Sequence, residues 1–380
     1  MEKVKLGDAC VFIRNGANIK NDKGKSGIPI TRIETIANGV IDEDSLGYAN
    51  IYDEKYEDYY LKQNDILMSH INSMKHLGKV AICNEDKKII HGMNLLNIRL
   101  KENILAKYVY YFFKTDSFRK QLHKISKQSV NQSSFNVNDF KKISIDLPDF
   151  RTQNKVADIM DKVEEIIDIR KKQIEQLDEL VKSQFVEMFK NSKKIKLCEM
   201  ANITMGQSPD SSSYNDNGEG VPFFQGKADY GEKYTVIRQW TSKPSKLANN
   251  GDVLMSVRAP VGPVNISSCD CCIGRGLCAI SAKDGVTNNE FIYNSLNAIQ
   301  DEISLMGAGS TFKAITKNDV FNIEIPFASI ELQNKFAEFV KQIDKQKFEI
   351  QKSLEETQKL QESLMNKYFG WMIVWKIEII

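Results

Sequence analysis

The chain has 380 residues, 42% of them hydrophobic, and a formal net charge of +2 with a pI near 8.0. This length accommodates two or three domains, and the near-neutral charge neither predicts nor excludes a nucleic-acid partner. The sequence shows no signal-peptide pattern, no apolar run of the ~20 residues that a membrane helix needs, and seven cysteines without framework spacing. The composition therefore indicates a cytoplasmic protein with reduced thiols and no membrane partner.

Short strands and a helix are predicted in the first 148 residues. Apolar and β-branched runs bounded by Gly, Asn and Asp predict strands over 28–33, 65–71, 79–83 and 95–100. Apolar residues at helical spacing, among them Leu105, Tyr108, Phe112, Leu122 and Ile125, predict a helix over 105–125. Residues 1–148 are therefore expected to form a mixed α/β domain.

A long helix is predicted over 149–192. No Pro or Gly interrupts its core, and only Arg170 and Gln184 break a heptad series of apolar residues. The series is Val156, Met160, Val163, Ile167, Ile174, Leu177, Val181 and Met188. A helix of about 40 residues is roughly 60 Å long, so its apolar stripe needs an equally long partner.

The second half of the chain repeats the first half in order. Residues 3–16, 27–39, 61–83 and 105–126 resemble residues 194–206, 220–231, 247–269 and 288–305. The stretch LPDFRTQNKVADIMDKVEEI at 147–166 resembles IPFASIELQNKFAEFVKQID at 325–344. The repeat predicts a second α/β domain over 193–326 and a second long helix over 327–370. Residues 371–380 form a C-terminal extension to which the pattern assigns no role.

The second helix carries a stripe that matches the first one, formed by Leu332, Phe336, Phe339, Ile343, Ile350, Leu364 and Tyr368. The predicted fold class is α+β: two similar α/β domains separated by a pair of long antiparallel coiled-coil helices, with a pseudo-two-fold internal duplication. Ordinary packing of these helices in a bundle is the alternative. Two similar domains at a fixed distance suit the reading of two DNA half-sites, since one turn of DNA spans about 34–36 Å.

This order of domain, helix, domain, helix resembles the specificity subunit of type I restriction–modification systems. The resemblance covers the chain to about residue 370. It is carried by KVKLGD at 3–8 and KIKLCE at 194–199, GDVLMSVRAPVGPVNI at 251–266, GSTFKAITKNDVFNIEIP at 309–326, Gln-Asn-Lys at 153–155 and 333–335, and the final NKYFG. The first half departs from the pattern, because SHINSMKHLGKV at 69–80 lacks the Arg-Ala-Pro of the second copy.

The resemblance implies that each domain is a target recognition domain that reads one half of a split double-stranded DNA site. The helices would set the spacing and dock two methyltransferase subunits. It also implies that this chain is not an enzyme and binds no cofactor. S-adenosylmethionine, ATP and Mg²⁺ would belong to the methyltransferase subunits and the restriction (translocase) subunits.

Two other classes of function are a self-contained DNA-modifying enzyme and a coiled-coil scaffold. The chain has no Asn/Asp-Pro-Pro-aromatic signature of amino-methyltransferases. GRGLCA at 274–279 precedes a predicted strand and not the helix that a cofactor fingerprint must open. Cys269, Cys271, Cys272 and Cys278 are spaced too closely for a structural zinc site, so no metal is expected.

The candidate DNA contacts are side chains on predicted loops that can pair with base edges or phosphates. In the first domain they are Ser69, His70, Asn72, Ser73, Lys75, His76, Lys127, Gln128, Ser129, Asn131 and Gln132. In the second domain they are Gln207, Ser208, Gln225, Lys227, Arg238, Ser256, Arg258, Ser310, Thr311 and Lys313. A solvated loop is the simpler interpretation of any one residue, so the prediction is regional: these loops together line one face.

Overall fold

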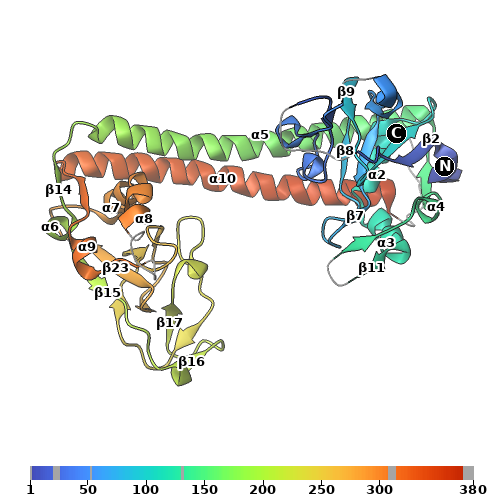
Figure 1. Cartoon of the computed structure of the whole chain (residues 1–380). Coiled ribbons are helices and arrows are strands. Elements are labelled where there is room, and N and C mark those ends of the chain that lie inside the picture. The colour runs from blue at the N-terminus through green and yellow to red at the C-terminus, as the bar shows by residue number, and fades with distance from the viewer. Residues whose placement is uncertain (1, 20–25, 52–53, 130–131, 307–313, 371–380) are drawn as a thin grey trace, which may run out of the picture. The chain divides into compact units, whose positions relative to one another are not determined.

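Two units divide the chain in the computed structural model, which describes residues 2–19, 26–51, 54–129, 132–306 and 314–370 (Figure 1). Unit 1 is built from the chain up to Arg170 and from Ser353 onward, and unit 2 from Lys171–Lys352. Each of two 40-residue helices, α5 (Phe150–Phe189) and α10 (Ile330–Phe369), contributes one half to each unit.

The central sheet of unit 1 is antiparallel, in the order β2-β10-β6-β8. These strands are β2 (Cys10–Asn15), β10 (Leu95–Leu100), β6 (Ile66–Ser69) and β8 (Val80–Ile82). A second sheet has the order β4-β3-β9-β5, a third β11-β12-β7, and β1 pairs with β13. The remaining bounds are β1 (Glu2–Lys5), β3 (Pro29–Ile30), β4 (Gly47–Tyr48), β5 (Tyr60–Leu61), β7 (Ile71–Asn72), β9 (Lys87–Ile90), β11 (Lys127–Gln128), β12 (Ser133–Ser134), β13 (Ser144–Leu147), α1 (Leu6–Ala9), α2 (Ala106–Phe113), α3 (Asp116–Ile125), α4 (Val137–Phe140), η1 (Glu34–Ile36), η2 (Glu43–Ser45) and η3 (Glu54–Tyr59).

Unit 2 repeats this plan. Its central sheet has the order β15-β23-β20-β21, with β15 (Ala201–Met205), β23 (Leu277–Ala282), β20 (Val253–Ser256) and β21 (Val264–Ile266). A five-stranded sheet has the order β16-β18-β17-β22-β19, and β14 pairs with β24. The remaining bounds are β14 (Lys194–Lys196), β16 (Tyr214–Asn215), β17 (Val221–Phe224), β18 (Trp240–Thr241), β19 (Leu247–Ala248), β22 (Cys271–Ile273), β24 (Glu324–Pro326), α6 (Leu197–Met200), α7 (Asn289–Ala298), α8 (Gln300–Met306), α9 (Lys317–Phe321), η4 (Ser211–Ser213) and η5 (Lys227–Asp229).

The equivalent strands β6 and β20 show why both sheets form. Their sequences are ILMS and VLMS, and all four residues of each strand are buried. A continuous apolar run of this length is typical of a strand covered on both faces. The predicted duplication and the mixed α/β content of both domains are therefore confirmed.

The helix predicted over 105–125 is wrong in one respect, because it is two helices. The chain breaks at Thr115, whose hydroxyl donates to the Phe112 carbonyl at 2.7 Å and accepts from the Phe118 N–H at 3.1 Å. This side chain caps α3 and redirects it without the help of Pro or Gly. The second copy breaks similarly between α7 and α8, at Ile299.

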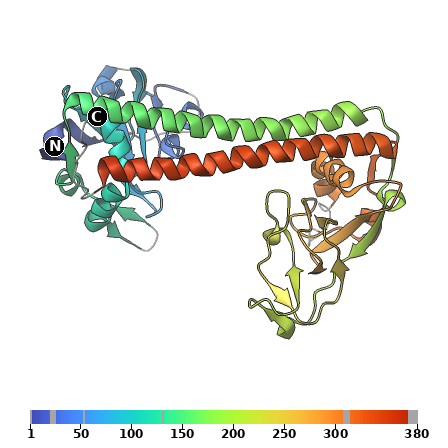
Figure 2. The same ribbon diagram turned by 180° about the vertical axis from the view of Figure 1, so that it is seen from behind.

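The long helices pack antiparallel within each unit, and Figures 1 and 2 both show them side by side. In unit 2 the end of α5 meets the start of α10, with the rings of Phe185 and Phe336 5.4 Å apart. In unit 1 the start of α5 meets the end of α10, where Val156 and Met160 share a core cluster with Phe369. The helix α10 ends beside Gly370, as predicted.

The predicted stripes cover only part of what the helices bury. Val156, Met160, Val163 and Ile167 of α5 are buried as predicted, but so are Phe185 and Phe189, which lie outside the heptad series. These two rings pack against Phe291 of α7 and Phe336 of α10 at centroid distances of 4.8–5.8 Å. The last turns of α5 therefore belong to the core of unit 2.

We expect Phe336→Ala to lower the free energy of unfolding of unit 2 by about 3–5 kcal/mol, because it leaves a cavity among these rings. Phe348→Ala on the same helix is the matched control, since its ring is 67% exposed, and should cost less than about 0.5 kcal/mol. Urea-dependent hydrogen exchange of the α7 and α10 amides measures both. Equal protection in the two variants would contradict the proposed core.

Candidate nucleic-acid interface

The two candidate loops of unit 1 meet in a small antiparallel sheet. Strand β7 follows β6 after His70, and it pairs with β12, which pairs with β11. Strand β12 is in the middle of this sheet. Its residue Ser133 pairs with Asn72 of β7 on one side and with Gln128 of β11 on the other. The segments around residues 72 and 128, more than 50 positions apart in the sequence, therefore lie together in unit 1.

Polar and basic side chains crowd this part of unit 1. Ser73, Lys75, Lys127, Gln128, Ser129 and Gln132 are exposed, and Asn72 and His76 are half-buried. Helix α3 buries Phe118 and Leu122 and exposes Arg119, Lys120, His123 and Lys124. A groove of about 770 Å³ separates α3 from the turn at residues 74–79 and is lined by Lys75, Lys79, Arg119 and His123, among others. Asn131 lies outside the described residues.

The expectation of exposed loops is wrong for Ser69 and His70, which are 1% and 5% exposed. Ser69 remains in β6, where its N–H donates to the Lys79 carbonyl at 2.9 Å and its carbonyl accepts from the Gly78 N–H at 2.8 Å. The His70 ring packs edge-on against Phe135, and burial lowers the pKa of this imidazole, which favours its neutral form. Both residues support the surface and do not form it.

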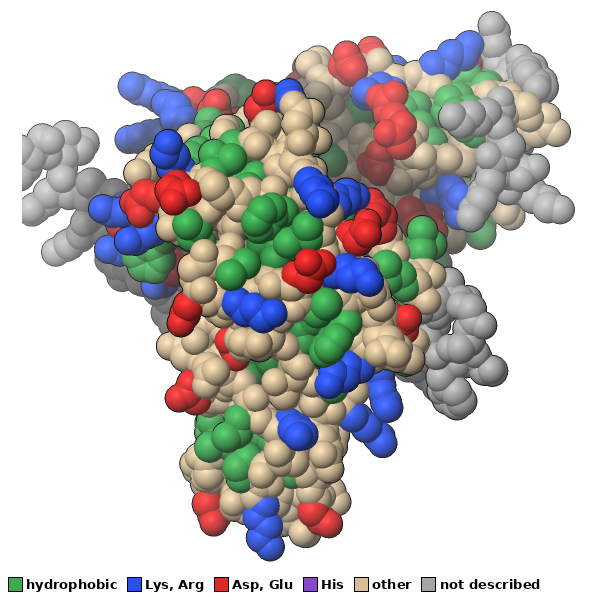
Figure 3. All heavy atoms as spheres, turned by 90° about the vertical axis from the view of Figure 1, so that its left-hand side faces the viewer, with side chains coloured by type: hydrophobic (Ala, Val, Ile, Leu, Met, Phe, Trp, Pro, Cys, Tyr) green, Lys and Arg blue, Asp and Glu red, His purple; other side chains and the backbone are tan. Residues whose placement is uncertain are grey.

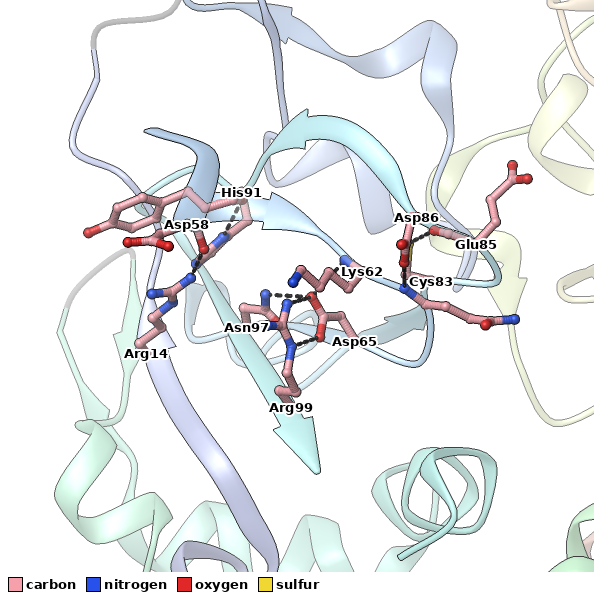
Figure 4. A network of polar contacts seen from close by, with 12 residues as sticks. Arg14, Asp58, Lys62, Asp65, Cys83, Glu85, Asp86, His91, Asn97 and Arg99 are labelled. Carbon is pink, nitrogen blue, oxygen red and sulfur yellow. Dashed lines mark hydrogen bonds and ion pairs between the residues drawn. The ribbon is translucent and has the colours of Figure 1, made fainter. Parts of the chain in front are cut away.

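A buried carboxylate holds the strand that leads to this surface (Figure 4). Asp65, with a side chain 0% exposed, precedes β6 and accepts from Arg99 Nε at 2.7 Å and Nη2 at 2.8 Å, and from Asn97 Nδ2 at 3.0 Å. It also accepts from the Lys62 N–H at 3.0 Å. The bidentate pair raises the pKa of Arg99 through its hydrogen bonds with Asp65 and orients β6 against β10.

In unit 2 the candidates Gln207, Ser208 and Gln225 gather around the turn at 274–276. The Gln207 N–H donates to the Ile273 carbonyl at 3.0 Å, and Ser208 Oγ accepts from the Arg275 N–H at 3.3 Å. A Cβ on Gly276 would lie 2.4 Å from the Gln225 carbonyl oxygen, so this approach requires glycine. Gln207, Gln225 and Arg275 are exposed, and Ser208 is half-buried.

Arg275 is a candidate that the sequence pattern did not single out. The segment GRGLCA matches a cofactor fingerprint in part, but its glycines and the strand that follows also indicate a tight turn with an arginine at its tip. The Val257 N–H donates to the Gly276 carbonyl at 2.9 Å, which places exposed Arg258 next to the same turn. Gln225 Nε2 donates to Gln239 Oε1 at 2.8 Å, beside exposed Arg238.

Ser256 is the third candidate whose expected exposure is wrong. It is 2% exposed, because it is the last residue of β20, and its hydroxyl donates to the Arg258 carbonyl at 3.0 Å. Lys227 is exposed at the start of η5. Ser310, Thr311 and Lys313 lie outside the described residues, but Ala314, which follows them, forms an antiparallel bridge with Arg258.

The two units share one arrangement, here called the junction: the residue that follows the third strand of the central sheet order accepts a backbone hydrogen bond from the segment that leads into a short capped helix. The Phe135 N–H donates to the His70 carbonyl at 3.3 Å in unit 1, and the Ile315 N–H donates to the Val257 carbonyl at 3.0 Å in unit 2. Each of these donors is followed by the residue that caps a short helix, Asn136 before α4 and Thr316 before α9. The framework is shared, while the side chains displayed beside it differ.

These surfaces carry donors for phosphates and base edges. On the face of unit 2 in Figure 3, basic and acidic side chains are interspersed.

Burial raises the pKa of the Cys271 and Cys278 thiols to about 12, so both are neutral. No group of three or more metal-ligating side chains occurs among the described residues. Within the same ranges, no helix is long and apolar enough to cross a membrane.

Comparison with known proteins gives a consistent picture. The family described as "Type I restriction modification DNA specificity domain" matches residues 1–179 and 190–361. A putative type I restriction enzyme MjaX specificity subunit of Methanocaldococcus jannaschii is 40% identical over 387 aligned positions, covering 95% of this chain and 91% of the relative.

Two solved structures extend the similarity to the fold. A chain from a study of complex assembly and conformational transition of the type I R-M system is 26% identical, with a TM-score of 0.63 and 96% of each chain covered. The S subunit of a type I restriction–modification system from M. genitalium has a TM-score of 0.61 at 15% identity, covering 98% of this chain and 96% of that one. At that identity the second similarity concerns the fold alone.

We expect Asp65→Asn to destabilise unit 1 by about 3 kcal/mol, because it leaves the half-buried Arg99 without its carboxylate. Asp252→Asn is the matched control. Asp252 occupies the equivalent turn and accepts from the Asn249 N–H at 2.8 Å, but the strand register puts Ser281 where unit 1 has Arg99. This variant should cost about 1 kcal/mol. Urea denaturation of both variants tests the difference, and a larger cost in Asp252→Asn would refute the assignment.

Proposed function

The chain belongs to the family of type I restriction–modification DNA specificity proteins, and we propose that it is the DNA-recognition subunit of such a system. Each recognition domain reads one half of a split double-stranded site. The observation that carries this proposal is the shared junction in the two units, which presents different side chains from one framework.

Equivalent positions around the turn at 92–94 in unit 1 and the turn at 274–276 in unit 2 illustrate this difference. The Ala17 N–H donates to the His91 carbonyl at 2.8 Å, as the Gln207 N–H does to Ile273 at 3.0 Å. Ala17 therefore stands where unit 2 has Gln207, and Met93, 45% exposed, stands where unit 2 has Arg275. Amide and guanidinium groups form the paired hydrogen bonds to base edges that the apolar side chains of alanine and methionine do not form. Two unlike half-sites are the expected target.

In unit 1 the basic side chains suit phosphates and the amides suit bases. Lys75, Arg119, Lys124 and Lys127 are exposed around the groove and the small sheet, and cations of this kind position a protein on the DNA backbone. Gln128, Gln132 and Asn72 can each donate and accept, which is what adenine requires in the major groove. In unit 2, Arg258 and Arg275 suit guanine.

The long helices are proposed to set the spacing and to dock two methyltransferase subunits. Recognition domains at 1–148 and 193–326 would alternate with helices at 149–192 and 327–370. The helices expose apolar side chains: Ile166, Ile169 and Leu360 in unit 1, and Leu180, Val186 and Phe348 in unit 2. Apolar groups that gather into a contiguous exposed patch are typical of protein interfaces, and Ile166 and Ile169 lie about one helical turn apart on α5.

Catalysis is assigned to the partner subunits. S-adenosylmethionine, ATP and Mg²⁺ would bind the methyltransferase and restriction (translocase) subunits, and the complex would act on DNA in the cytoplasm. Family membership favours this proposal over a scaffold that never binds DNA or a self-contained modifying enzyme.

Deletion of the gene should remove methylation from one split motif, two short half-sites around a fixed gap, throughout the genome of the source cells. Methylation mapping with and without the gene measures this and identifies both half-sites. In a control reaction, the purified chain alone should transfer no labelled methyl group from S-adenosylmethionine to DNA. Transfer by the lone chain would contradict the proposed division of labour.

Salt dependence should report how unit 1 binds phosphates. Removing one cation that neutralises a phosphate should reduce the magnitude of the slope of log affinity against log salt by about 0.9, because fewer counterions are released. We expect this for Lys75→Met, Arg119→Met and Lys127→Met in the assembled complex. Lys182→Met on α5, where Lys182 pairs with Glu179 three residues before it, is the control of equal charge. An unchanged slope in the three variants would remove this surface from the interface.

A further inference from the structure

The start of each long helix is attached to its own domain through a buried glutamine. In unit 1, Gln153 is 3% exposed; its Oε1 accepts from the Leu105 N–H at 2.9 Å and its Nε2 donates to the Pro148 carbonyl at 2.9 Å. The bonds join α5 to the residue that precedes α2. An amide is needed here, because it is donor and acceptor at once.

Unit 2 has the same attachment at Gln333, which is 0% exposed. Its Oε1 accepts from the Thr287 hydroxyl at 2.7 Å, and its Nε2 donates to the carbonyls of Val286 at 3.0 Å and Ala328 at 2.9 Å. These bonds join α10 to the loop that precedes α7, which is the helix equivalent to α2. The repeated Gln-Asn-Lys motif is therefore a structural joint in both units.

A second attachment lies eleven residues further along each helix. Glu164 Oε1 accepts from Lys114 Nζ at 2.7 Å in unit 1, and Asp344 Oδ2 accepts from Lys233 Nζ at 2.6 Å in unit 2. Eleven residues are close to three helical turns, so glutamine and carboxylate lie on one face about 16 Å apart. In each unit, both attachments join residues of that same unit.

The lysines come from different elements although the helix position is the same. Lys114 follows α2, whereas Lys233 lies in the loop after η5 and also contacts Glu290 of α7 at 3.0 Å. Both side chains are largely buried, at 29% and 16% exposed. Burial lowers the pKa of Lys233, but Glu290 and Asp344 more than offset this effect and its pKa lies above the usual value. The pKa of Lys114 is likewise raised, with Glu164 among the causes that offset its burial. Both lysines are therefore charged.

We propose that these four residues, Gln153 with Glu164 and Gln333 with Asp344, are positioning residues that determine which gap length the chain accepts between half-sites. This inference rests on the proposed function. The shared apolar core holds each helix against its domain without a strong directional preference. With only one polar attachment, the domain can therefore tilt about that point. With a second attachment about 16 Å away, a displacement of ~1 Å at that contact corresponds to a tilt of only about 4°.

Tilt of a domain matters because the position and orientation of a DNA half-site change strongly with the gap length. One base pair more or less in the gap moves a half-site by about 3.4 Å along the helix axis and turns it by about 35°. A domain that is attached to its helix at two points can contact a half-site at only one gap length. A domain attached at one point can tilt and so contact half-sites whose gap is one base pair shorter or longer.

The test uses cells that carry the complete system and variants of this chain. Methylation is mapped at pairs of half-sites with the native gap and with gaps one base pair shorter or longer. Glu164→Gln and Asp344→Asn remove the carboxylates of the second attachments and so weaken them. The contacts of Asp161 with Lys107 and Tyr111 in unit 1, and of Lys347 with Glu232 in unit 2, are left in place. Asp344→Asn leaves Lys233 paired with Glu290, so this buried lysine keeps a carboxylate. Glu179→Gln and Glu187→Gln are matched controls, since Glu179 pairs with Lys182 on α5 and Glu187 pairs with Lys190, the residue that follows α5.

In the double variant Glu164→Gln/Asp344→Asn we expect the ratio of methylation at the native gap to that at the neighbouring gaps to fall about tenfold, or about 1.4 kcal/mol of discrimination. The controls should keep the native ratio. Lys233→Arg, which keeps a cation beside Asp344, should also keep it. Gln153→Met and Gln333→Met should lower the ratio further, and their thermal melting shows whether they fold.

Three results decide between the alternatives. A lower ratio at equal chain abundance supports the positioning role. Less methylation at every gap with an unchanged ratio would show a purely structural role and overturn the inference. If the unmodified chain supports no gap-dependent methylation at all, the proposed function itself is wrong.

Discussion

Two 40-residue helices that bury one face and expose the other determine how the rest of the molecule is built. A helix of this length with an apolar stripe is not stable alone in water, because most helical stability in proteins comes from packing of that stripe. In each unit one half of α5 packs against one half of α10, and a domain core closes over them. In unit 2 this core includes the packed rings of Phe185, Phe189, Phe291 and Phe336, from α5, α7 and α10. The domains are consequently folded onto the helices and not merely linked to them.

The attachment of domain to helix uses polar groups as well as apolar ones. Apolar contacts hold surfaces together without a strong directional preference, whereas the amides of Gln153 and Gln333 accept only one arrangement of donors and acceptors. Ion pairs three turns further along add a second directional contact. This combination gives a firm joint whose geometry is repeated in both units while the surrounding loops diverge.

The division between framework and displayed side chains accounts for the proposed role. The central sheets, the junctions at His70 and Val257 and the capped helices that follow are equivalent in the two units. The exposed positions beside them are not equivalent: unit 1 displays lysines, amides and Met93, and unit 2 displays Arg258, Arg275 and Gln225. A duplicated framework with unlike surfaces suits the reading of two different sequences.

The sequence by itself determined the duplication, the two long helices, the buried strands and the Gln-Asn-Lys starts, because each of these follows from local periodicity or from direct self-similarity. Only the tertiary structure decided which polar residues form a surface. Ser69, His70 and Ser256 look like loop residues but are buried. Ser69 and Ser256 are the last residues of β6 and β20, and His70 lies between β6 and β7, where its ring packs against Phe135. Arg275 stands far from Ser208 in the sequence, and its N–H reaches the Ser208 hydroxyl only because β22 and β23 bring the turn there. The break at Thr115 depends on one side-chain hydrogen bond that periodicity does not register. Periodicity reports which face of an element is buried, whereas the meeting of distant segments depends on long-range register, which a local pattern does not contain.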